Sequence, residues 1–339
     1  MIDLYQSWEK AVNPLKRRFW KAQIDVLRAV PPLLGIVSGR SLGADKSLKI
    51  WTKTMLQTAV QAPGALFLHW RNRREGRVAL PRVSFVVATR CTLNCDKCVA
   101  HMPDLKNKAD APLPVLLDDI HRLLACVDAV YDINISGGEA FLRPDLDRIV
   151  EAIAETGKVS DINVTTNGTV IPDGKVLAAL KAANVTVKIS RYPLKLQPEA
   201  EQLKRALEQH GVRYTHESGA FWRDTADLAF RRKTGGLPPV GNEAARRRFS
   251  GCIEQLGLPY LGGKLYLCCE SAILAHEGII PAGVGDCIDL RATSPAAFGD
   301  QWRKLLERRA VSACAWCGGY TNETRKVPVA VQREPRGRE

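Results

Sequence analysis

Three cysteines stand close together in the segment that follows the first predicted strand. Cys91, Cys95 and Cys98 have the spacing C-x3-C-x2-C and come directly after Val83–Ala88, a short apolar run that favours a strand. Three thiolates in one loop hold three irons of a [4Fe–4S] cluster and leave the fourth iron open to a small ligand. The alternative is a zinc site that a distant ligand such as His101 completes.

Polar and glycine-rich segments follow the next predicted strands. They are Ser136-Gly137-Gly138-Glu139, then Thr165-Thr166-Asn167-Gly168, then Ser190 and Arg191. Two adjacent glycines let a backbone approach a ligand closely, and a carboxylate such as Glu139 binds an ammonium group. Residues at the carboxyl ends of barrel strands are the usual place for an active site, so these segments predict one site at that edge.

Together with the cysteine motif, these segments resemble the radical S-adenosylmethionine (AdoMet) superfamily over residues 81–220. The resemblance implies that Gly-Gly-Glu binds the AdoMet amino group, that Thr166 and Asn167 line the same pocket, and that Ser190 contacts the ribose. For Arg191 it implies the AdoMet carboxylate, with a surface salt bridge as the alternative. It also implies reductive cleavage of AdoMet to a 5′-deoxyadenosyl radical, which removes a hydrogen atom from the substrate.

The sequence departs from this family at two places. Lys97 stands directly before the third cysteine, where the family usually has an aromatic residue. The family's glycine-rich adenine motif does not follow the fifth predicted strand. The residues that contact adenine therefore stay unassigned.

A second group of cysteines lies in the last third of the chain. Its members are Cys252, Cys268, Cys314 and Cys317, and Gly263 precedes Cys268 with the spacing G-x4-C. This pattern resembles the twitch domain, a shortened SPASM domain, and is similar to that of the radical AdoMet dehydrogenases that act on 2-deoxy-scyllo-inosamine. The resemblance implies an auxiliary [4Fe–4S] cluster with four thiolate ligands, which transfers electrons. A structural zinc site with four thiolates is the alternative.

The remaining cysteines and several polar residues are weaker candidates. Cys126 lies in an apolar helical segment and is expected to pack in the core. Cys269 and Cys287 are candidates for an alternative ligand or a hydrogen-atom donor, and inert packing is the alternative for both. The candidates for a general base are Tyr192, His216, Glu217, Asp224 and Glu270, all near predicted strand ends or a linker, with a surface position as the alternative.

The elements that carry these residues alternate between strands and helices. Strands are predicted at 83–88, 132–135, 161–165, 185–189 and 212–215, with helices near 113–129, 144–157, 174–183 and 198–210. This alternation predicts an α/β fold, a partial (β/α)6 TIM-like barrel over residues 79–235. We expect a basic helical extension at 1–78 and a disordered basic tail at 325–339. Between barrel and tail, a small α+β cysteine-rich domain is predicted at 250–324, with a hairpin near 260–269 and a helix near 295–310.

Composition narrows the class of protein. The 339 residues carry a net charge of +13, of which +9 falls in residues 1–80 and +3 in 325–339, so the catalytic part is nearly neutral. A nearly neutral core argues against nucleic acid as a partner. The chain has no signal-peptide pattern and no apolar run of 18 residues, so we expect a cytoplasmic protein. The basic-aromatic run at 16–21 suggests peripheral membrane contact, and packing against the barrel is the alternative.

These features predict a radical AdoMet oxidoreductase. Its expected reaction is dehydrogenation of an alcohol in a sugar or aminocyclitol-like small molecule, with the second electron passing to the auxiliary cluster. An external electron donor such as flavodoxin or ferredoxin is implied. Two alternatives remain at this stage, an epimerase that uses a cysteine hydrogen donor and a peptide maturase.

Overall fold

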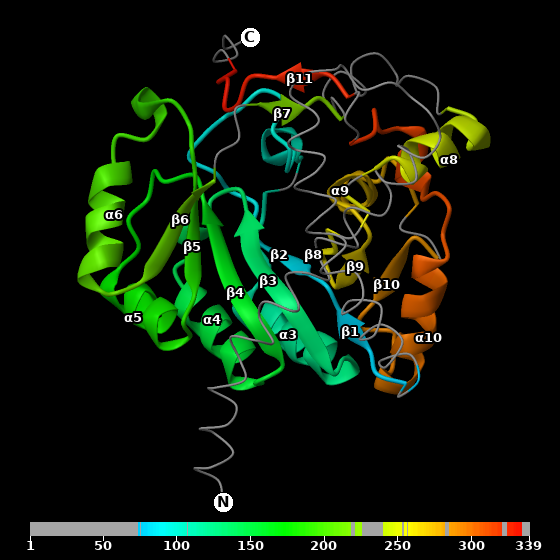
Figure 1. Ribbon diagram of the computed structural model, residues 1–339, viewed down its shortest axis with the longest axis horizontal. Helices are drawn as coiled ribbons and strands as arrows, with labels where there is room; N and C mark the ends of the chain where they lie inside the picture. Colours follow the sequence, from blue (N-terminus) through cyan, green and yellow to red (C-terminus); the bar gives the residue numbers. More distant parts are fainter. Residues whose placement is uncertain are drawn as a thin grey trace, which may run out of the picture.

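The structure is a computed structural model that describes Arg74 and residues 76–106, 108–217, 221–225, 240–252, 254–255, 257–281, 285–320 and 324–333. A mixed sheet runs through this part of the chain in the order β10-β9-β8-β2-β3-β4-β5-β6, with the short strand β1 beside β3 (Figure 1). The strands are β1 (Ala79–Leu80), β2 (Val83–Ala88), β3 (Ala129–Gly137), β4 (Val159–Thr166), β5 (Thr186–Ser190), β6 (Arg213–Glu217), β8 (Pro259–Leu261), β9 (Lys264–Tyr266) and β10 (Cys287–Asp289).

Six neighbouring strands, from β8 through β2 to β6, are parallel. Side chains alternate in burial along β2: Val83, Phe85 and Val87 are almost fully buried, and the residues between them are half-buried. This alternation places one face of the strand in the core. The predicted α/β fold with a partial barrel is confirmed by this parallel arrangement. All five predicted barrel strands are present, with ends that differ by up to three residues.

Helices connect the parallel strands and cover the sheet. They are α3 (Leu113–Cys126), α4 (Leu146–Glu155), α5 (Gly174–Ala182) and α6 (Ala200–Gln209). In α4 the apolar residues Leu146, Ile149, Val150 and Ile153 recur at helical spacing and are buried. Asp173 begins α5 by accepting a hydrogen bond from the Val176 N–H. Neighbouring helices pack against each other in the order α3, α4, α5.

The cysteine-rich part joins the barrel through the same sheet. Strand β8 pairs in parallel with β2, and β8–β9 form a hairpin whose turn uses Gly262 and Gly263, both at positive φ. The Phe85 and Tyr260 rings lie 5.0 Å apart within one continuous hydrophobic core. Helix α10 (Pro295–Leu306) packs on α3. The α+β part expected at 250–324 therefore extends the barrel sheet, with no break between them in the described residues.

The hairpin predicted at 260–269 is shorter than expected. Its second strand ends at Tyr266, and helix α9 (Cys269–His276) begins three residues later. Cys268 is the residue that precedes this helix, so Cys268 and Cys269 do not alternate across a strand. The side chains of Cys268 and Cys269 follow no strand alternation, because the backbone is extended at Cys268 and helical from Cys269 onward.

The prediction of a disordered tail at 325–339 is wrong for the described residues 325–333. Strand β11 (Lys326–Val327) pairs with β7 (Trp222–Arg223), and Gln332 forms a β-bridge with Cys95. Proline and charged residues suggested disorder, but the backbone hydrogen bonds of this segment are made to distant parts of the chain, which composition does not reveal.

The predicted helices of the N-terminal extension, and with them the possible membrane contact, lie outside the described residues apart from positions 74 and 76–78. Within the part of the chain that is described, no helix combines the length and the apolar character needed to cross a bilayer.

Candidate functional site

The predicted site residues meet at the carboxyl ends of the parallel strands. The cysteine loop follows β2, the Gly-Gly-Glu segment ends β3, Thr166 ends β4 and Ser190 ends β5 (Figure 1). Since β2, β3, β4 and β5 are sequential neighbours in the sheet, their following segments lie side by side.

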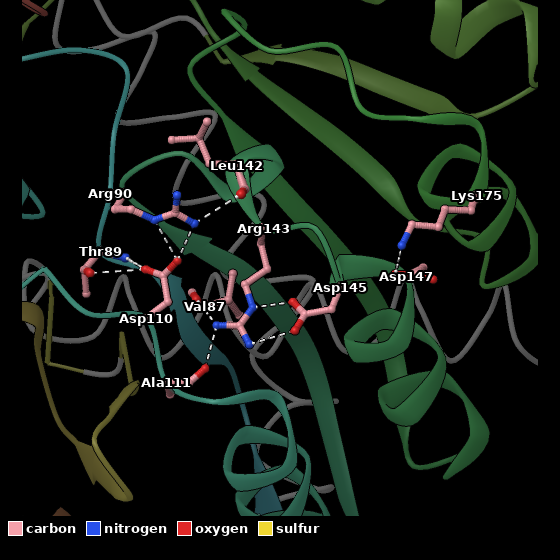
Figure 2. A network of polar contacts seen from close by, with 10 residues as sticks. All are labelled: Val87, Thr89, Arg90, Asp110, Ala111, Leu142, Arg143, Asp145, Asp147 and Lys175. Atoms are coloured by element: carbon pink, nitrogen blue, oxygen red, sulfur yellow. Dashed lines mark hydrogen bonds and ion pairs between the residues drawn. The ribbon is translucent and has the colours of Figure 1, made fainter.

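Two arginine–aspartate pairs fix the backbone that leads into the cysteine loop (Figure 2). Arg90 donates two hydrogen bonds to Asp110, at 2.8 and 3.0 Å, and Asp110 also accepts from the Thr89 N–H and hydroxyl. Arg143 is buried and donates to the carbonyls of Val87 and Ala111 as well as to its neighbour Asp145. Because planar guanidinium groups bind two acceptors in fixed geometry, this arrangement holds the last turn before Cys91 in place.

The two glycines of the Gly-Gly-Glu segment pack against the same backbone. The N–H of Gly138 donates to the Ala88 carbonyl at 2.8 Å, and the N–H of Glu139 donates to the Arg90 carbonyl at 2.9 Å. A Cβ added at Gly137 would lie 2.1 Å from the Ala88 oxygen, and one at Gly138 would lie 2.2 Å from the Arg90 oxygen. Both positions need glycine because the end of β3 packs directly against the backbone that leads into the cysteine loop. This packing role comes in addition to the contact with a ligand that the sequence predicts.

The Glu139 carboxylate is fully buried and accepts three hydrogen bonds from the protein. The donors are the Phe141 N–H at 2.9 Å, the Thr166 hydroxyl at 2.9 Å and the Asn167 N–H at 2.7 Å. Burial raises the pKa of Glu139, and these three donors act against that rise. Glu139 therefore ties the end of β3 to the end of β4.

Asn167 extends this connection to the first cysteine. Its side-chain amide donates to the Thr92 hydroxyl at 2.9 Å and lies 3.5 Å from the Cys91 sulfur. Gln197, which the sequence analysis missed, is buried and donates to the carbonyls of Asn167 and Ser190 while accepting from the Tyr192 N–H. No local motif marks Gln197, because its partners lie on two different strand ends.

The three motif cysteines form one electrostatically coupled group. Burial raises the pKa of all three thiols, that of Cys95 to about 11, and the charges of the neighbouring cysteines raise the pKa of Cys95 further. Thiolate ligands must lose their protons, and a bound iron cluster would stabilise the deprotonated form of these thiols. Lys97, within the loop, forms an ion pair with Asp224 at 3.6 Å.

The other candidates near β5 and β6 are distributed more widely. Arg191 and His216 are largely exposed. The part of the His216 ring that is covered, together with the positive charges of Lys204 and Arg191, lowers the pKa of His216. Tyr192 is half-buried and stacks edge-to-face on Trp222. Burial raises the pKa of Tyr192, as do the charges of Cys95, Cys98 and Cys91. Glu217 ends β6, and its side chain lies outside the described part.

The second group of cysteines lines one cavity of about 200 Å³. Its wall includes all four residues predicted as auxiliary ligands: Cys252, Cys268, Cys314 and Cys317. Burial raises the pKa of each thiol, that of Cys268 to about 12. Arg248 of α8 (Asn242–Ser250) donates to the carbonyls of Cys314 and Cys317, and the Gly319 N–H donates to the Cys317 sulfur at 3.2 Å.

This cavity borders the first cysteine loop. Val99 and Ala100, which directly follow Cys98, form part of its wall. Cys269 also lines it, and its sulfur lies 3.6 Å from the Val99 carbonyl. Burial raises the pKa of Cys269 strongly, as do nearby charges that include Glu270 and Cys98.

A buried pair joins the two cysteine regions. The His101 ring lies 3.1 Å from the Glu270 carboxylate, so the loop after Cys98 contacts the first turn of α9. His101 is thereby engaged with Glu270 in the structure, and Glu270 is on the cavity wall. Cys287 lies on β10 opposite Tyr266, and Cys126 is buried at the end of α3; neither lines the cavity.

The donor sets fit iron–sulfur clusters. In the described part of the chain, no three His, Cys, Asp or Glu side chains are arranged to hold a single metal ion. Ligands of a four-iron cluster bind separate irons and need not converge on one point. Three grouped thiols in one loop and four around one cavity match the ligand numbers of an open and a closed cluster.

Comparison with known proteins finds a family match for the part of the chain that carries the first cysteine group. Residues 85–214 match the Radical SAM superfamily. GTP 3′,8-cyclase of Stenotrophomonas maltophilia (strain K279a) is 31% identical over 114 residues, which cover 32% of this chain and 34% of that protein. A probable GTP 3′,8-cyclase of Methanothermobacter marburgensis is 35% identical over 102 residues, covering 30% and 31%. The chain thus spans about a third of the length of these curated relatives.

Two solved structures show low similarity. The crystal structure of BtrN in complex with AdoMet and 2-DOIA has 15% identity and a TM-score of 0.44, covering 73% of this chain and 97% of that chain. Native anSMEcpe with bound AdoMet has 17% identity and a TM-score of 0.35, covering 41% and 44%. The family match is the finding that bears on the first site: residues 85–214 are similar to the Radical SAM superfamily, whose members use a [4Fe–4S] cluster and AdoMet.

Proposed function

We propose that this protein is a radical AdoMet oxidoreductase that dehydrogenates an alcohol of a sugar or aminocyclitol-like small molecule. The observation that carries the proposal is the cavity in which four cysteine thiols meet, directly beside the loop of the first cysteine group. A cluster held there would lie beside the first cysteine loop and would take up the second electron that an oxidation removes from the substrate.

At the first site, Cys91, Cys95 and Cys98 would hold a [4Fe–4S] cluster. When bound, this cluster supplies an electron that cleaves AdoMet to methionine and a 5′-deoxyadenosyl radical. The chain positions the reactants. Gly137 and Gly138 keep the backbone of β3 against the cysteine loop, and Glu139 holds the Thr166–Asn167 segment beside it.

At the second site, Cys252, Cys268, Cys314 and Cys317 would hold an auxiliary [4Fe–4S] cluster. Arg248 and the Gly319 N–H orient the Cys314–Cys317 loop toward the cavity. The auxiliary site would accept the electron that a substrate radical loses.

Electrons and atoms balance in this scheme. One electron from an external donor of the flavodoxin or ferredoxin type and one AdoMet give methionine and 5′-deoxyadenosine, which carries one hydrogen atom from the substrate carbon. The second substrate electron passes to the auxiliary site, and the hydroxyl proton passes to a base. The product is a ketone, two electrons more oxidised than the alcohol.

The test starts with metal content. After anaerobic reconstitution, the full chain should bind about eight irons and lose about four of them when Cys91, Cys95 and Cys98 are changed to Ala together. Joint replacement of Cys252, Cys268, Cys314 and Cys317 should remove the other four. Cys287→Ala is the matched control and should keep all of them. About four irons plus one zinc in the wild-type protein would remove the oxidase argument.

Activity is tested on candidate substrates with a reductant and AdoMet. Equal amounts of 5′-deoxyadenosine and ketone product support the proposal, whereas a product at the oxidation level of its substrate contradicts it. GTP belongs among the candidates because the curated relatives carry the name GTP 3′,8-cyclase. Their similarity covers only about a third of each chain, so GTP is a comparison rather than the proposed substrate.

Epimerisation is the second candidate, and the position of Cys269 favours it. The Cys269 sulfur lies 3.6 Å from the Val99 carbonyl in the loop of the first cysteine group, and in an epimerase this thiol would return a hydrogen atom to the substrate radical. Under this alternative, Cys269→Ala should abolish solvent deuterium incorporation into product, while Cys287→Ala should have no effect. A Cys269→Ala variant that keeps full turnover excludes Cys269 as the hydrogen donor.

A further inference from the structure

The last described segment of the chain lies across the first cysteine loop. We call residues 326–333 the C-terminal strap. It begins with β11, which pairs with β7, and continues to a β-bridge between Gln332 and Cys95. The two bridged residues are 237 positions apart in the sequence.

Backbone hydrogen bonds hold the strap to the loop on both sides of this bridge. The Asp96 N–H donates to the Val331 carbonyl at 2.6 Å, and the Arg333 N–H donates to the Asn94 carbonyl at 2.8 Å. Arg333 also binds the Asp104 carboxylate, at 2.9 and 3.0 Å, and Asp104 is buried. Ala330 and Val327 are buried as well, so the strap is packed against the protein.

Among the described residues, the Gln332 amide makes three polar contacts, all within the strap and the loop. Its oxygen accepts from the Asn94 N–H at 2.8 Å, and its nitrogen donates to the Ala330 carbonyl at 2.8 Å and to the Cys95 sulfur at 3.1 Å. Rotating the amide by 180° would place its NH2 group against the Asn94 N–H and its oxygen against the Ala330 carbonyl. The surrounding donors and acceptors therefore dictate that an N–H points at the sulfur.

We propose that Gln332 is a positioning residue that sets the reduction potential of the cluster held by Cys95. This inference rests on the proposed function, because it takes Cys95 as a ligand. A reduced cluster carries one more negative charge than an oxidised one, much of it on sulfur, so an N–H donor to a ligand sulfur stabilises the reduced form. The strap thereby makes the cluster easier to reduce, and it connects electron delivery to the folding of the C-terminal end onto the barrel.

The test is a redox titration of the anaerobically reconstituted full chain, followed by electron paramagnetic resonance. The signal that changes when AdoMet is added identifies the cluster of the first cysteine group. Gln332→Leu removes the donor, and Gln332→Asn shortens its reach by one methylene; both should lower the midpoint potential. Gln332→Glu adds a negative charge without a donor and should lower it most. Gln209→Leu, at the exposed end of α6, is the control and should match the wild type.

A second measurement distinguishes loss of the hydrogen bond from a general disturbance of the fold around the cluster. After exchange into D2O, pulsed measurements on the reduced cluster should detect a deuteron coupling in the wild type that is lost in Gln332→Leu. Equal potentials in wild type and all three Gln332 variants would overturn the inference, as would loss of the cluster from all three. If the joint Cys91, Cys95 and Cys98 variant keeps all its iron, the proposed function itself fails, which is a different outcome.

Discussion

At the residue scale, the first cysteine group is held by small and buried side chains that do not themselves carry the reaction. Gly137 and Gly138 allow β3 to touch the backbone before Cys91, and Glu139 has no exposed surface. The Gly-Gly-Glu segment therefore shapes the cysteine loop in addition to any contact with AdoMet. We therefore expect a substitution in the Gly-Gly-Glu segment to act mainly by displacing the cysteine loop.

Replacing Gly138 by Ala should displace the cysteine loop. The new Cβ would lie 2.2 Å from the Arg90 oxygen and 3.0 Å from the Cys91 Cβ, so backbone must move. Overpacking of this kind costs about 1–3 kcal/mol, and we expect a lower melting temperature with loss of about four irons per chain. Gly174→Ala is the control, since nothing lies within 4 Å of its Cβ position at the start of α5. Equal iron content in the two variants would contradict the steric argument.

At the element scale, the loop after β2 depends on contacts with the segment before α3. Asp110 is the central residue, since it binds Thr89 and Arg90 and so fixes the two residues that precede Cys91 (Figure 2). Burial alone would raise the pKa of Asp110, but the hydrogen bonds from Thr89 and Arg90 and the Arg90 charge outweigh it and lower that pKa. The ionised carboxylate is therefore the form that stabilises the fold.

Asp110→Asn should lower the melting temperature at neutral pH and lose this effect in acid. Because the pKa of Asp110 is lowered on folding, its contribution is complete above the ordinary value near 3.8 and is lost as pH falls through the lowered value. Because Arg90 is half-exposed, solvent weakens the pair, and we expect the free energy of unfolding to fall by about 1 kcal/mol at pH 7. Thermal melts at pH 7 and pH 3 check this, with Asp118→Asn on the exposed face of α3 as control. A difference between wild type and Asp110→Asn that stays constant with pH would contradict it.

The elements of the barrel could be predicted from the sequence because each has a local signal. Val83–Ala88 is apolar and short, and α4 repeats its apolar residues at helical spacing. The resemblance of the last third of the chain to a twitch domain predicts that the four cysteines of the second group act together, and the structure brings them to one cavity. Gln197 and Gln332 could not be recognised, because each acts through partners from distant segments. The strap was missed for the same reason, since its pairing with Asn94 and Cys95 leaves no local pattern.

At the scale of the whole molecule, the barrel and the cysteine-rich part share one sheet and one core. Strand β8 continues the parallel order beside β2, and α10 packs on α3. The structure thereby fixes the second cysteine group relative to the first. If both cysteine groups hold clusters, as proposed, one continuous sheet would keep the distance between the two clusters constant.

A polar contact between α3 and the cysteine-rich part allows a test of whether the two parts unfold together. Asp119 is fully buried, accepts from Arg291 at 2.6 and 2.9 Å, and also accepts from the Tyr260 hydroxyl. Arg291→Ala leaves the buried Asp119 carboxylate with the Tyr260 hydroxyl as its donor. Because Arg291 itself is half-exposed, we expect the free energy of unfolding to fall by about 1–2 kcal/mol. Arg303→Ala on the exposed face of α10 is the control and should change stability little.

Chemical denaturation of the Arg291→Ala variant should show one transition at lower denaturant, detected together by circular dichroism and by tryptophan fluorescence. A single transition is expected because β8, β9 and β10 cannot separate from the sheet without exposing the core that Tyr260 shares with Phe85. If the cysteine-rich part instead unfolded first, in a separate transition that left the barrel intact, the two cysteine groups would belong to independent units. Their relative position would then vary, which would argue against the proposed transfer of the second electron between them.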